Sequence, residues 1–346
     1  MKRRSGLPPE DAIVARLAAA FATRRRDVKV GIGDDAAVVV SPDRLAVTTD
    51  VLLEDHDFRK DADPRRLGRK AMNVNLSDLA AMGARPLWAV LALGLPKKTT
   101  PEWLDALAAG VKEAASEHGV AVVGGDLSAS DKVFVAVTAM GHAPETPLTR
   151  AGAEPGDALF VSGTLGAAAA GLRLLEKGYR LSDERVALDP KGRRVSAPRA
   201  QEVARLIRHL IDPRPQLVLG STLAAASLAS AAIDVSDGLA RDLYRLCRAS
   251  DVGATIEADR LPVDSALADL GPLAGLDPLA AALYGGEDFG LLFTVPKKKL
   301  AAVDRLAGTF ALRRIGTIDD GAGVRLVRDG RRTPLPDAGF DHFDAG

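Results

Sequence analysis

Short apolar runs of strand length alternate with stretches of helical periodicity along this chain. In the first half, strand-like runs cover residues 45–49, 88–93, 120–123 and 133–140, and helical patterns between them cover residues 65–82 and 102–117. A similar unit follows, in which an apolar run at residues 158–163 leads into a small-residue helix over residues 166–177. The alternation predicts an α/β fold in two units, each with helices packed on a sheet.

Prolines and glycines mark the predicted boundary between the two units. Pro144 and Pro147 enclose a short polar segment, and Gly152 and Gly156 follow it. We expect an N-terminal domain over residues 1–143 and a C-terminal α/β domain over residues 150–346. The chain has 346 residues, of which 47% are apolar, enough for two packed cores. Residues 178–201 are charged and lack periodicity, which predicts a long mobile loop.

The charge balance argues against partners that are recognised by a global electrostatic field. Lys plus Arg and Asp plus Glu each number 46, so we expect neither a nucleic acid nor a membrane surface as a partner. The longest uncharged run, residues 215–233, contains Gly220 and Thr222 and few large apolar side chains. It is expected to form a buried helix leading into a strand, so no segment is expected to span a membrane.

The single cysteine and the N-terminal residues both suggest the cytoplasm. Cys247 alone excludes a disulfide framework and a cysteine zinc site, and it is expected to be a core thiol in a reducing compartment. The basic start is followed by Glu10 and Asp11, which interrupt what would be the apolar part of a secretory signal.

Polar side chains occur in an unusual place near the end of the predicted helix 65–82. Leu67, Ala71 and Leu79 recur at helical spacing, and Gly83 is suited to close the helix in a left-handed conformation. Asp78 comes late in this helix among apolar neighbours, where a carboxylate is costly unless it meets a cation or several hydrogen bonds. We therefore expect a partner for Asp78.

Acidic residues recur beside small residues in six segments, at residues 31–35, 48–50, 75–78, 124–126, 233–238 and 285–288. Most are expected at strand ends, where α/β domains bind ligands and where glycine lets an anion approach the backbone. Carboxylates repel phosphate unless metal ions lie between them, and oxygen ligands without His or Cys favour Mg²⁺. A single Gly-Asp pair usually marks a turn, but the recurrence of such segments indicates a ligand site. No P-loop and no protein-kinase catalytic loop is present, so phosphates are expected to be held through metal ions.

The order and spacing of these segments resemble the thiamine-monophosphate kinase family. The resemblance rests on Gly31-Ile32-Gly33-Asp34-Asp35-Ala36, Thr48-Thr49-Asp50, the run from Asn75 to Ala84, Gly124-Gly125-Asp126, Leu148-Thr149-Arg150, Ile233-Asp234-Val235-Ser236-Asp237-Gly238-Leu239, Gly285-Gly286-Glu287-Asp288-Phe289 and Gly339-Phe340-Asp341-His342-Phe343. It implies a two-domain aminoimidazole ribonucleotide synthetase-like fold, with an N-terminal mixed sheet that pairs in a homodimer. It also implies ATP-dependent phosphorylation of thiamine monophosphate to thiamine diphosphate, with ATP as co-substrate and several Mg²⁺ ions.

The resemblance also implies roles for individual residues. The implied metal ligands are Asp35, Thr48, Thr49, Asp50, Asp78, Asp126, Asp234 and Asp237. Residues implied to bind ATP are Gly125, Asp126, Arg150 and Ser236, and those implied to bind the thiamine part are Glu287 and Phe340. No general base is expected, because the acceptor phosphate is already largely ionised at neutral pH.

One segment departs from the family pattern. The family reads Thr-Asp-x-Leu-Val-x-Gly-x-His-Phe, whereas this chain has Asp57 at the place of the histidine and Asp55 at the place of the glycine. Asp57 and the neighbouring His56 are both candidates for the substrate side. An offset of one residue on a strand would turn His56 to the opposite face.

Three alternatives remain open from the sequence. A selenophosphate synthetase would carry a Cys or equivalent in a glycine-rich N-terminal arm, which this sequence lacks, and would produce AMP. A nucleotide-binding maturation factor of the same superfamily would end in cysteine, whereas this sequence ends Asp344-Ala345-Gly346. An ATP-binding module without turnover would use the same aspartates as an enzyme.

Overall fold

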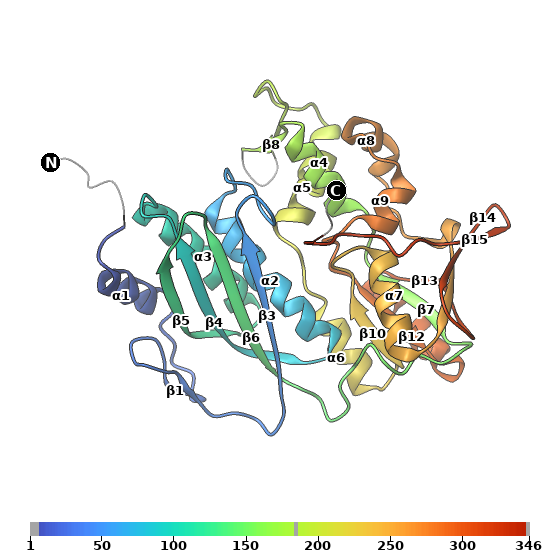
Figure 1. Ribbon diagram of the computed structural model, residues 1–346, viewed down its shortest axis with the longest axis horizontal. Helices are drawn as coiled ribbons and strands as arrows, with labels where there is room; N and C mark the ends of the chain where they lie inside the picture. The colour runs from blue at the N-terminus through green and yellow to red at the C-terminus, as the bar shows by residue number, and fades with distance from the viewer. Residues whose placement is uncertain (1–6, 183–185, 344–346) are drawn as a thin grey trace. The chain divides into compact units, whose positions relative to one another are not determined.

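The chain forms two compact units in the computed structural model, which describes residues 7–182 and 186–343. Unit 1 contains the residues up to Leu79 and those from Ala84 to Glu145. Unit 2 contains Ala80–Gly83 and the residues from Thr146 onward. Each unit is built around its own sheet (Figure 1).

Unit 1 is a mixed four-stranded sheet in the order β3-β6-β4-β5, with helices on one face (Figure 1). Strands β4 and β5 are parallel, and the other neighbours are antiparallel. Its elements in chain order are α1 (Glu10–Ala20), β1 (Val28–Val30), β2 (Val38–Val39), β3 (Leu45–Leu53), α2 (Pro64–Ala81), β4 (Arg85–Leu95), α3 (Pro101–Glu117), β5 (Ala121–Ala129) and β6 (Phe134–His142).

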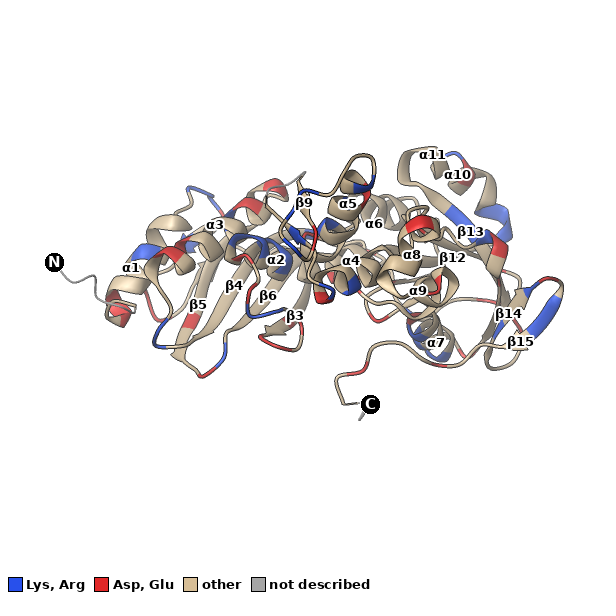
Figure 2. Ribbon diagram, turned by 90° about the horizontal axis from the view of Figure 1, so that it is seen from above, with Lys and Arg blue, Asp and Glu red and all other residues tan. Residues whose placement is uncertain are grey.

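Helices α2 and α3 approach each other closely because glycines stand at the crossing. A Cβ added at Gly68 would lie 2.2 Å from the carbonyl oxygen of Leu107, and one at Gly110 would lie 1.8 Å from that of Arg65. Two ion pairs join the helices at the surface, Arg65 with Glu113 and Arg69 with Glu117, and Figure 2 shows charges of both signs there. The close crossing buries side chains such as Met72, Leu76 and Leu104.

Unit 2 is a mixed seven-stranded sheet in the order β10-β12-β7-β13-β11-β14-β15. Only the β11–β14 pair is parallel within this sheet as described. The elements of unit 2 are β7 (Ala158–Ser162), α4 (Ala167–Glu176), β8 (Arg180–Leu181), β9 (Ala187–Leu188), α5 (Arg199–Ile211), α6 (Leu217–Ala225), β10 (Ala231–Asp234), α7 (Leu239–Ser250), β11 (Gly253–Glu257), η1 (Ala258–Arg260), α8 (Leu267–Ala274), α9 (Pro278–Tyr284), β12 (Leu291–Val295), η2 (Lys297–Lys299), α10 (Leu300–Asp304), α11 (Ala307–Phe310), β13 (Leu312–Asp319), β14 (Val324–Arg328) and β15 (Arg331–Pro334).

The central strands of this sheet are buried on both faces. Along β7, Leu159 and Val161 pack in one apolar cluster with α7, while Phe160 packs in another with α6 and stacks on Phe293. Cys247 lies in the first cluster, and burial raises the pKa of its thiol to about 12. The expectation of a core thiol is therefore confirmed. A strand covered on both faces reads as an uninterrupted apolar run, which is the pattern seen at residues 158–163.

The structure differs from the expected loop at residues 178–201. Strands β8 and β9 pair there, Ala187 is buried, and α5 already begins at Arg199. A turn follows β9, in which the Asp189 carboxylate accepts the N–H groups of Lys191 and Arg193, each at 2.9 Å. Residues 183–185 of the expected loop lie outside the described residues. Two-residue strands are too short to leave a periodic signal in the sequence.

The uncharged run at residues 215–233 forms α6 and β10, as expected. None of the helices in the described part of the chain combines the length and the apolar character needed to cross a membrane.

Candidate functional site

Unit 1 carries an open pocket of about 670 Å³ that is lined by strands β4, β5 and β6 and by the loop between β1 and β2. Asp34 and Asp35 come from the loop, and Gly125 and Asp126 come from β5. The structure thus brings three predicted residues, Asp35, Gly125 and Asp126, to one pocket. Among residues 7–182 and 186–343, neither Asp35 nor Asp126 forms an ion pair, so the pocket presents two exposed carboxylates.

The two glycines before Asp126 have different roles. A Cβ at Gly125 would lie 1.9 Å from the carbonyl oxygen of Leu91 on β4, so glycine is required for β5 to pair with β4. A Cβ at Gly124 would meet only Val90 and Ala37 at 3.5 and 4.0 Å, which are ordinary contact distances. Gly125 is therefore explained by strand packing, independently of any ligand.

Strand β3 places its predicted residues on both faces of the sheet. Thr48 donates its hydroxyl to the Asp78 carboxylate on α2 at 2.5 Å, and the N–H of Asp50 donates to the Asn75 side-chain oxygen at 3.0 Å. Thr49 points to the opposite face, where its hydroxyl accepts from that of Thr138, a residue of the pocket, at 3.0 Å. Successive strand residues alternate between faces, so these candidates form two sets and not one.

The predicted position of acids at strand ends is wrong for two of them. Asp50 lies inside β3 and Asp126 lies inside β5, because both strands extend beyond the apolar runs that predicted them. Asp234, in contrast, is the last residue of β10.

The donor set of unit 1 fits Mg²⁺ better than a metal that needs a complete protein cage. No group of three or more His, Cys, Asp or Glu side chains in the described residues is close enough to hold a metal ion. The candidates instead offer one or two oxygen ligands at a time: Asp35 and Asp126 in the pocket, and Asp78 with Thr48 behind the sheet. Mg²⁺ is commonly bound in this way, by one or two carboxylates together with water and substrate phosphates.

His56 and Asp57 lie in a turn after the end of β3 at Leu53. The Asp57 carboxylate accepts the N–H of Leu53 at 2.8 Å, while His56 is exposed. A shift of one residue does not turn a side chain to the opposite face here, because His56 and Asp57 lie in a turn and not on a strand. The structure gives Asp57 a local role in closing the turn.

In unit 2, Ser236 and Asp237 follow β10 and are held by a residue that the sequence analysis missed. The buried Asp242 carboxylate accepts the N–H groups of Ser236 and Asp237, each at 3.0 Å. Arg245 lies 2.6 Å from Asp237 and 2.7 Å from Asp242. Burial, with the nearby Asp237 charge, raises the pKa of Asp242 to about 6. An acid in the first turn of α7 was the available signal, because such acids accept N–H groups at a helix start.

The segment near the C-terminus also reaches this loop. Phe340 donates its N–H to the carbonyl oxygen of Asp237 at 2.9 Å, and Asp341 pairs with Arg241 at 2.8 Å. Phe340 is 45% exposed, and the ring of His342 lies edge-on to its ring with the centroids 4.7 Å apart. The structure thus brings the predicted residues Ser236, Asp237 and Phe340 together.

Glu287 joins the same group, whereas Arg150 is placed elsewhere in unit 2. The N–H of Glu287 donates to the carbonyl oxygen of Ser236 at 2.7 Å. Arg150 is exposed and follows Thr149, whose carbonyl accepts from Ala232 near the start of β10. Asp234 ends that strand.

Two family models match the chain in succession. The AIR synthase related protein N-terminal domain matches residues 33–143, and the AIR synthase related protein C-terminal domain matches residues 154–329. Together they cover most of both units.

Several similar proteins are named thiamine-monophosphate kinase. Thiamine-monophosphate kinase of Salmonella typhimurium is 36% identical over 340 residues, covering 96% of this chain and 98% of that protein. A crystal structure of thiamine-monophosphate kinase from Stenotrophomonas maltophilia has a TM-score of 0.78 and 38% identity, covering 93% of this chain and 97% of that chain. The structure of AaThiL complexed with AMPPCP and TMP has a TM-score of 0.75 and 31% identity, covering 99% of both chains.

Proposed function

This chain belongs to the thiamine-monophosphate kinase family, and from that membership we propose that it transfers the terminal phosphoryl group of ATP to thiamine monophosphate, forming thiamine diphosphate and ADP. The relative complexed with an ATP analogue and TMP is the observation that carries the substrate assignment. That relative is similar to this chain over 99% of its length.

The chemistry requires positioning and charge compensation more than proton transfer. A phosphate monoester has its second pKa at about 6, so the acceptor oxygen is already largely ionised at neutral pH. We therefore assign no general base. Bound Mg²⁺ would supply charge neutralisation between the two phosphate groups. Direct in-line transfer, without a phosphoenzyme, is the proposed course.

The residues proposed to hold Mg²⁺ carry carboxylate or hydroxyl oxygen atoms, the hard ligands that this ion prefers. In unit 1 they are Asp35, Asp126, Thr48, Thr49, Asp50 and Asp78, and in unit 2 they are Asp234 and Asp237. We further propose that Gly125, Asp126, Arg150 and Ser236 contact ATP. Asp242 and Arg245 support the second set by holding the backbone of Ser236 and the carboxylate of Asp237.

The thiamine part is proposed to lie against Glu287 and Phe340, which both contact the Ser236–Asp237 backbone. An exposed aromatic ring offers a stacking surface, and a carboxylate attracts the cationic thiazolium ring. Of the two candidates at the departing segment, His56 is the one with an exposed side chain, since the Asp57 carboxylate is occupied by the N–H of Leu53.

We test the function by incubating the chain with ATP, Mg²⁺ and thiamine monophosphate and measuring products by mass spectrometry. Thiamine diphosphate and ADP are expected in equal amounts. Free thiamine is expected to be a poor acceptor, because its hydroxyl has neither the charge nor the low pKa of a phosphate. AMP with free phosphate would contradict the kinase assignment, and so would binding of ATP without any product.

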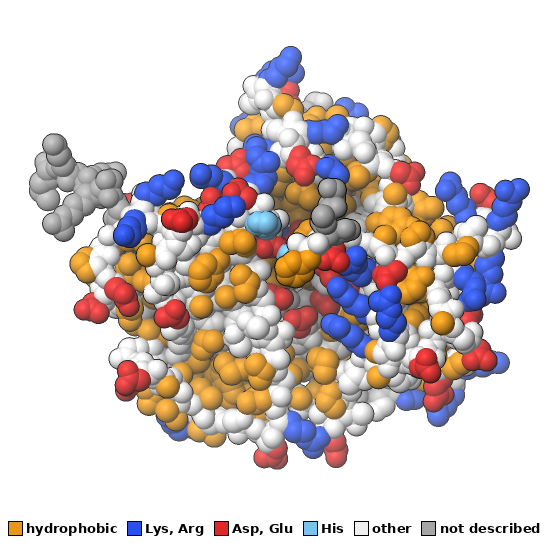
Figure 3. All heavy atoms as spheres, viewed as in Figure 1, with side chains coloured by type: hydrophobic (Ala, Val, Ile, Leu, Met, Phe, Trp, Pro, Cys, Tyr) orange, Lys and Arg blue, Asp and Glu red, His pale blue; other side chains and the backbone are white. Residues whose placement is uncertain are grey.

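A homodimer is proposed from the exposed apolar side of β3. Val47 and Val51 are 61% and 54% exposed on this edge strand, and Leu45 lies on the same face. Figure 3 shows hydrophobic side chains gathered on the side of the unit 1 sheet that faces the viewer. Exposed apolar rows of this kind mark association surfaces.

Light scattering of the purified chain is expected to give twice the mass of one chain, and Val47→Lys is expected to give the monomer. A wild-type monomer at micromolar concentration would contradict the proposal.

We also place the chain in the cytoplasm, a proposal supported by its single, buried cysteine.

A further inference from the structure

The segment Gly285–Phe289, which joins α9 to β12, has a backbone that non-glycine residues seldom adopt. Glu287 has φ of 66° and Phe289 has φ of 49°, on either side of Asp288. L-amino acids disfavour the left-handed region because Cβ approaches the following carbonyl oxygen. The segment must therefore be held in this conformation by its surroundings.

Backbone hydrogen bonds fix the segment to the residues that follow β10. Glu287 donates its N–H to the carbonyl oxygen of Ser236 at 2.7 Å, and Phe289 donates to that of Val235 at 2.8 Å. A Cβ at Gly286 would lie 2.7 Å from the Ser236 carbonyl oxygen. The segment thus lies directly against the residues after β10.

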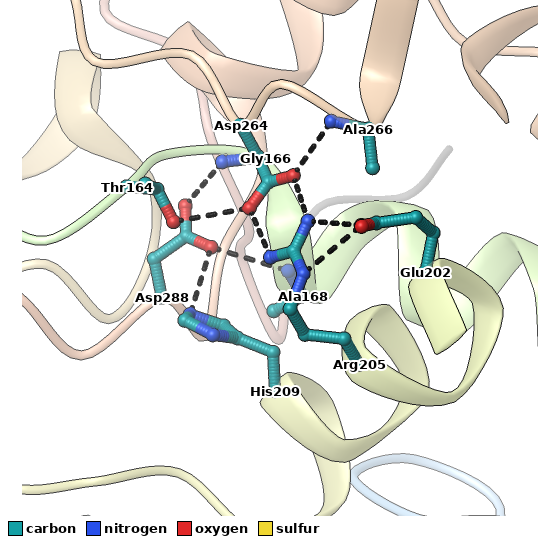
Figure 4. Close-up of polar contacts among 9 residues, drawn as sticks. All are labelled: Thr164, Gly166, Ala168, Glu202, Arg205, His209, Asp264, Ala266 and Asp288. Carbon is teal, nitrogen blue, oxygen red and sulfur yellow. Dashed lines mark hydrogen bonds and ion pairs between the residues drawn. The ribbon is translucent and has the colours of Figure 1, made fainter. Parts of the chain in front are cut away.

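The side chain of Asp288 fixes the segment to the start of α4. One carboxylate oxygen accepts the N–H of Gly166 at 2.6 Å and the other accepts that of Ala168 at 3.2 Å, both at the start of α4 (Figure 4). The positive end of the helix favours a carboxylate at this place. The Asp288 side chain is 0% exposed, so it cannot reach a ligand itself.

Two further groups lie beside Asp288 in Figure 4. His209 has its Nε2 atom 3.6 Å from the Asp288 carboxylate, and burial lowers the pKa of this histidine. Asp264 is buried as well, but it accepts two bonds of 2.6 Å from Arg205 and one of 3.0 Å from the N–H of Ala266. The Thr164 hydroxyl also donates to Asp264, at 3.2 Å. None of these hydrogen bonds reaches Gly285–Phe289, so Asp264 is a buried acid of the same cluster that does not fix the segment.

We propose that Asp288 is a positioning residue for recognition of the thiamine part: it ties the segment to α4 and thereby fixes the direction in which Glu287 presents its carboxylate. The ligand group that Glu287 would recognise is a cationic or hydrogen-bond-donating heterocycle, since a carboxylate only accepts hydrogen bonds. The inference rests on the proposed function through the role given to Glu287.

Asp288→Asn tests the proposal. An amide has one accepting oxygen, so either Gly166 or Ala168 would face an NH₂ group and lose its bond. We expect the KM for thiamine monophosphate to rise about tenfold and the KM for ATP to change by less than about threefold, because only the thiamine-side carboxylate is displaced. Hydrogen exchange of the amides in residues 285–289 is expected to become faster.

Asp264→Asn is the matched control, since it neutralises a buried acid of the same cluster and keeps an acceptor for Ala266. It is expected to lower thermal stability without changing either KM. If it raised the KM for thiamine monophosphate as much as Asp288→Asn does, the effect would be general destabilisation and the proposal would be wrong. If Asp288→Asn is not recovered folded, Asp288→Ser, which brings no NH₂ group against the helix, replaces it with the same expected results.

A double-mutant cycle with Glu287→Gln shows whether Asp288 acts through Glu287. Asp288→Asn is expected to add less than about twofold to the KM in the Glu287→Gln background. Independent, multiplying effects would overturn the proposal. If the wild-type chain does not phosphorylate thiamine monophosphate, the proposed function fails, and the exchange rates of residues 285–289 still decide whether Asp288 holds the segment.

Discussion

Asp78→Asn is expected to lower kcat/KM by about 100-fold or more while the unfolding temperature stays equal or rises. Asp78 accepts the Thr48 hydroxyl at 2.5 Å, and an asparagine oxygen can accept the same bond. The substitution therefore removes a negative charge at nearly constant shape. Loss of a charge that would hold Mg²⁺ acts on turnover, whereas loss of a partly buried charge relieves a desolvation cost.

Steady-state kinetics and thermal unfolding without ligand measure the two effects separately. Asp105→Asn on α3, which loses an exposed ion pair with Arg16, controls for loss of an acid outside the site, and its kcat/KM is expected to stay near the wild-type value. A variant of Asp78 that unfolds several degrees earlier but keeps its kcat/KM would show that the residue is structural.

Gly125→Ala is expected to destabilise the fold by more than about 3 kcal/mol. The new methyl carbon would lie 1.9 Å from the carbonyl oxygen of Leu91 and 2.8 Å from its carbonyl carbon, and these backbone atoms belong to β4, inside the sheet. Either the β4–β5 pairing opens or the strand shifts. Urea unfolding is expected to show a much lower midpoint, or the variant is recovered only as aggregate.

Gly124→Ala is the matched control, one residue away. Its methyl group would meet Val90 and Ala37 at 3.5 Å or more, so a change in stability below about 1 kcal/mol is expected. If Gly125→Ala were as stable as the wild type and lost only affinity for ATP, the glycine would serve the approach of a ligand and the steric explanation would fail.

The regular elements could be predicted where one periodicity extends over many residues. Helix α2 and its closure at Gly83, with φ of 68°, follow from the spacing of apolar residues. The ends of β3 and β5 could not be predicted in this way. Asp50 and the pair Gly124–Gly125 disfavour strands as isolated residues, and they adopt the strand conformation because neighbouring strands supply hydrogen bonds and, at Gly125, leave no room for a side chain.

The candidate site could be predicted as a list of residues and not as an arrangement. Recurring acids pointed to Asp35, Asp78, Asp126 and Asp237. In the structure, however, Thr48 and Thr49 lie on opposite faces of the sheet, and the candidates therefore do not form one cluster. Asp288 acts by accepting backbone N–H groups of a distant segment, at the start of α4. Such bonds depend on which loops meet in space, and the spacing of one sequence carries no information about that.

The C-terminal segment is expected to attach to the rest of unit 2 late in folding. Phe340 is fixed by its N–H bond to Asp237, and Asp341 pairs with Arg241 100 positions earlier. This contact closes late during synthesis, after the seven strands of the unit 2 sheet have been made. Phe340 and Asp341 are exposed, so this contact should also open at a lower free energy than the core. Limited proteolysis near residue 338 is therefore expected to yield a folded body that lacks Phe340, the aromatic residue proposed to bind the thiamine part.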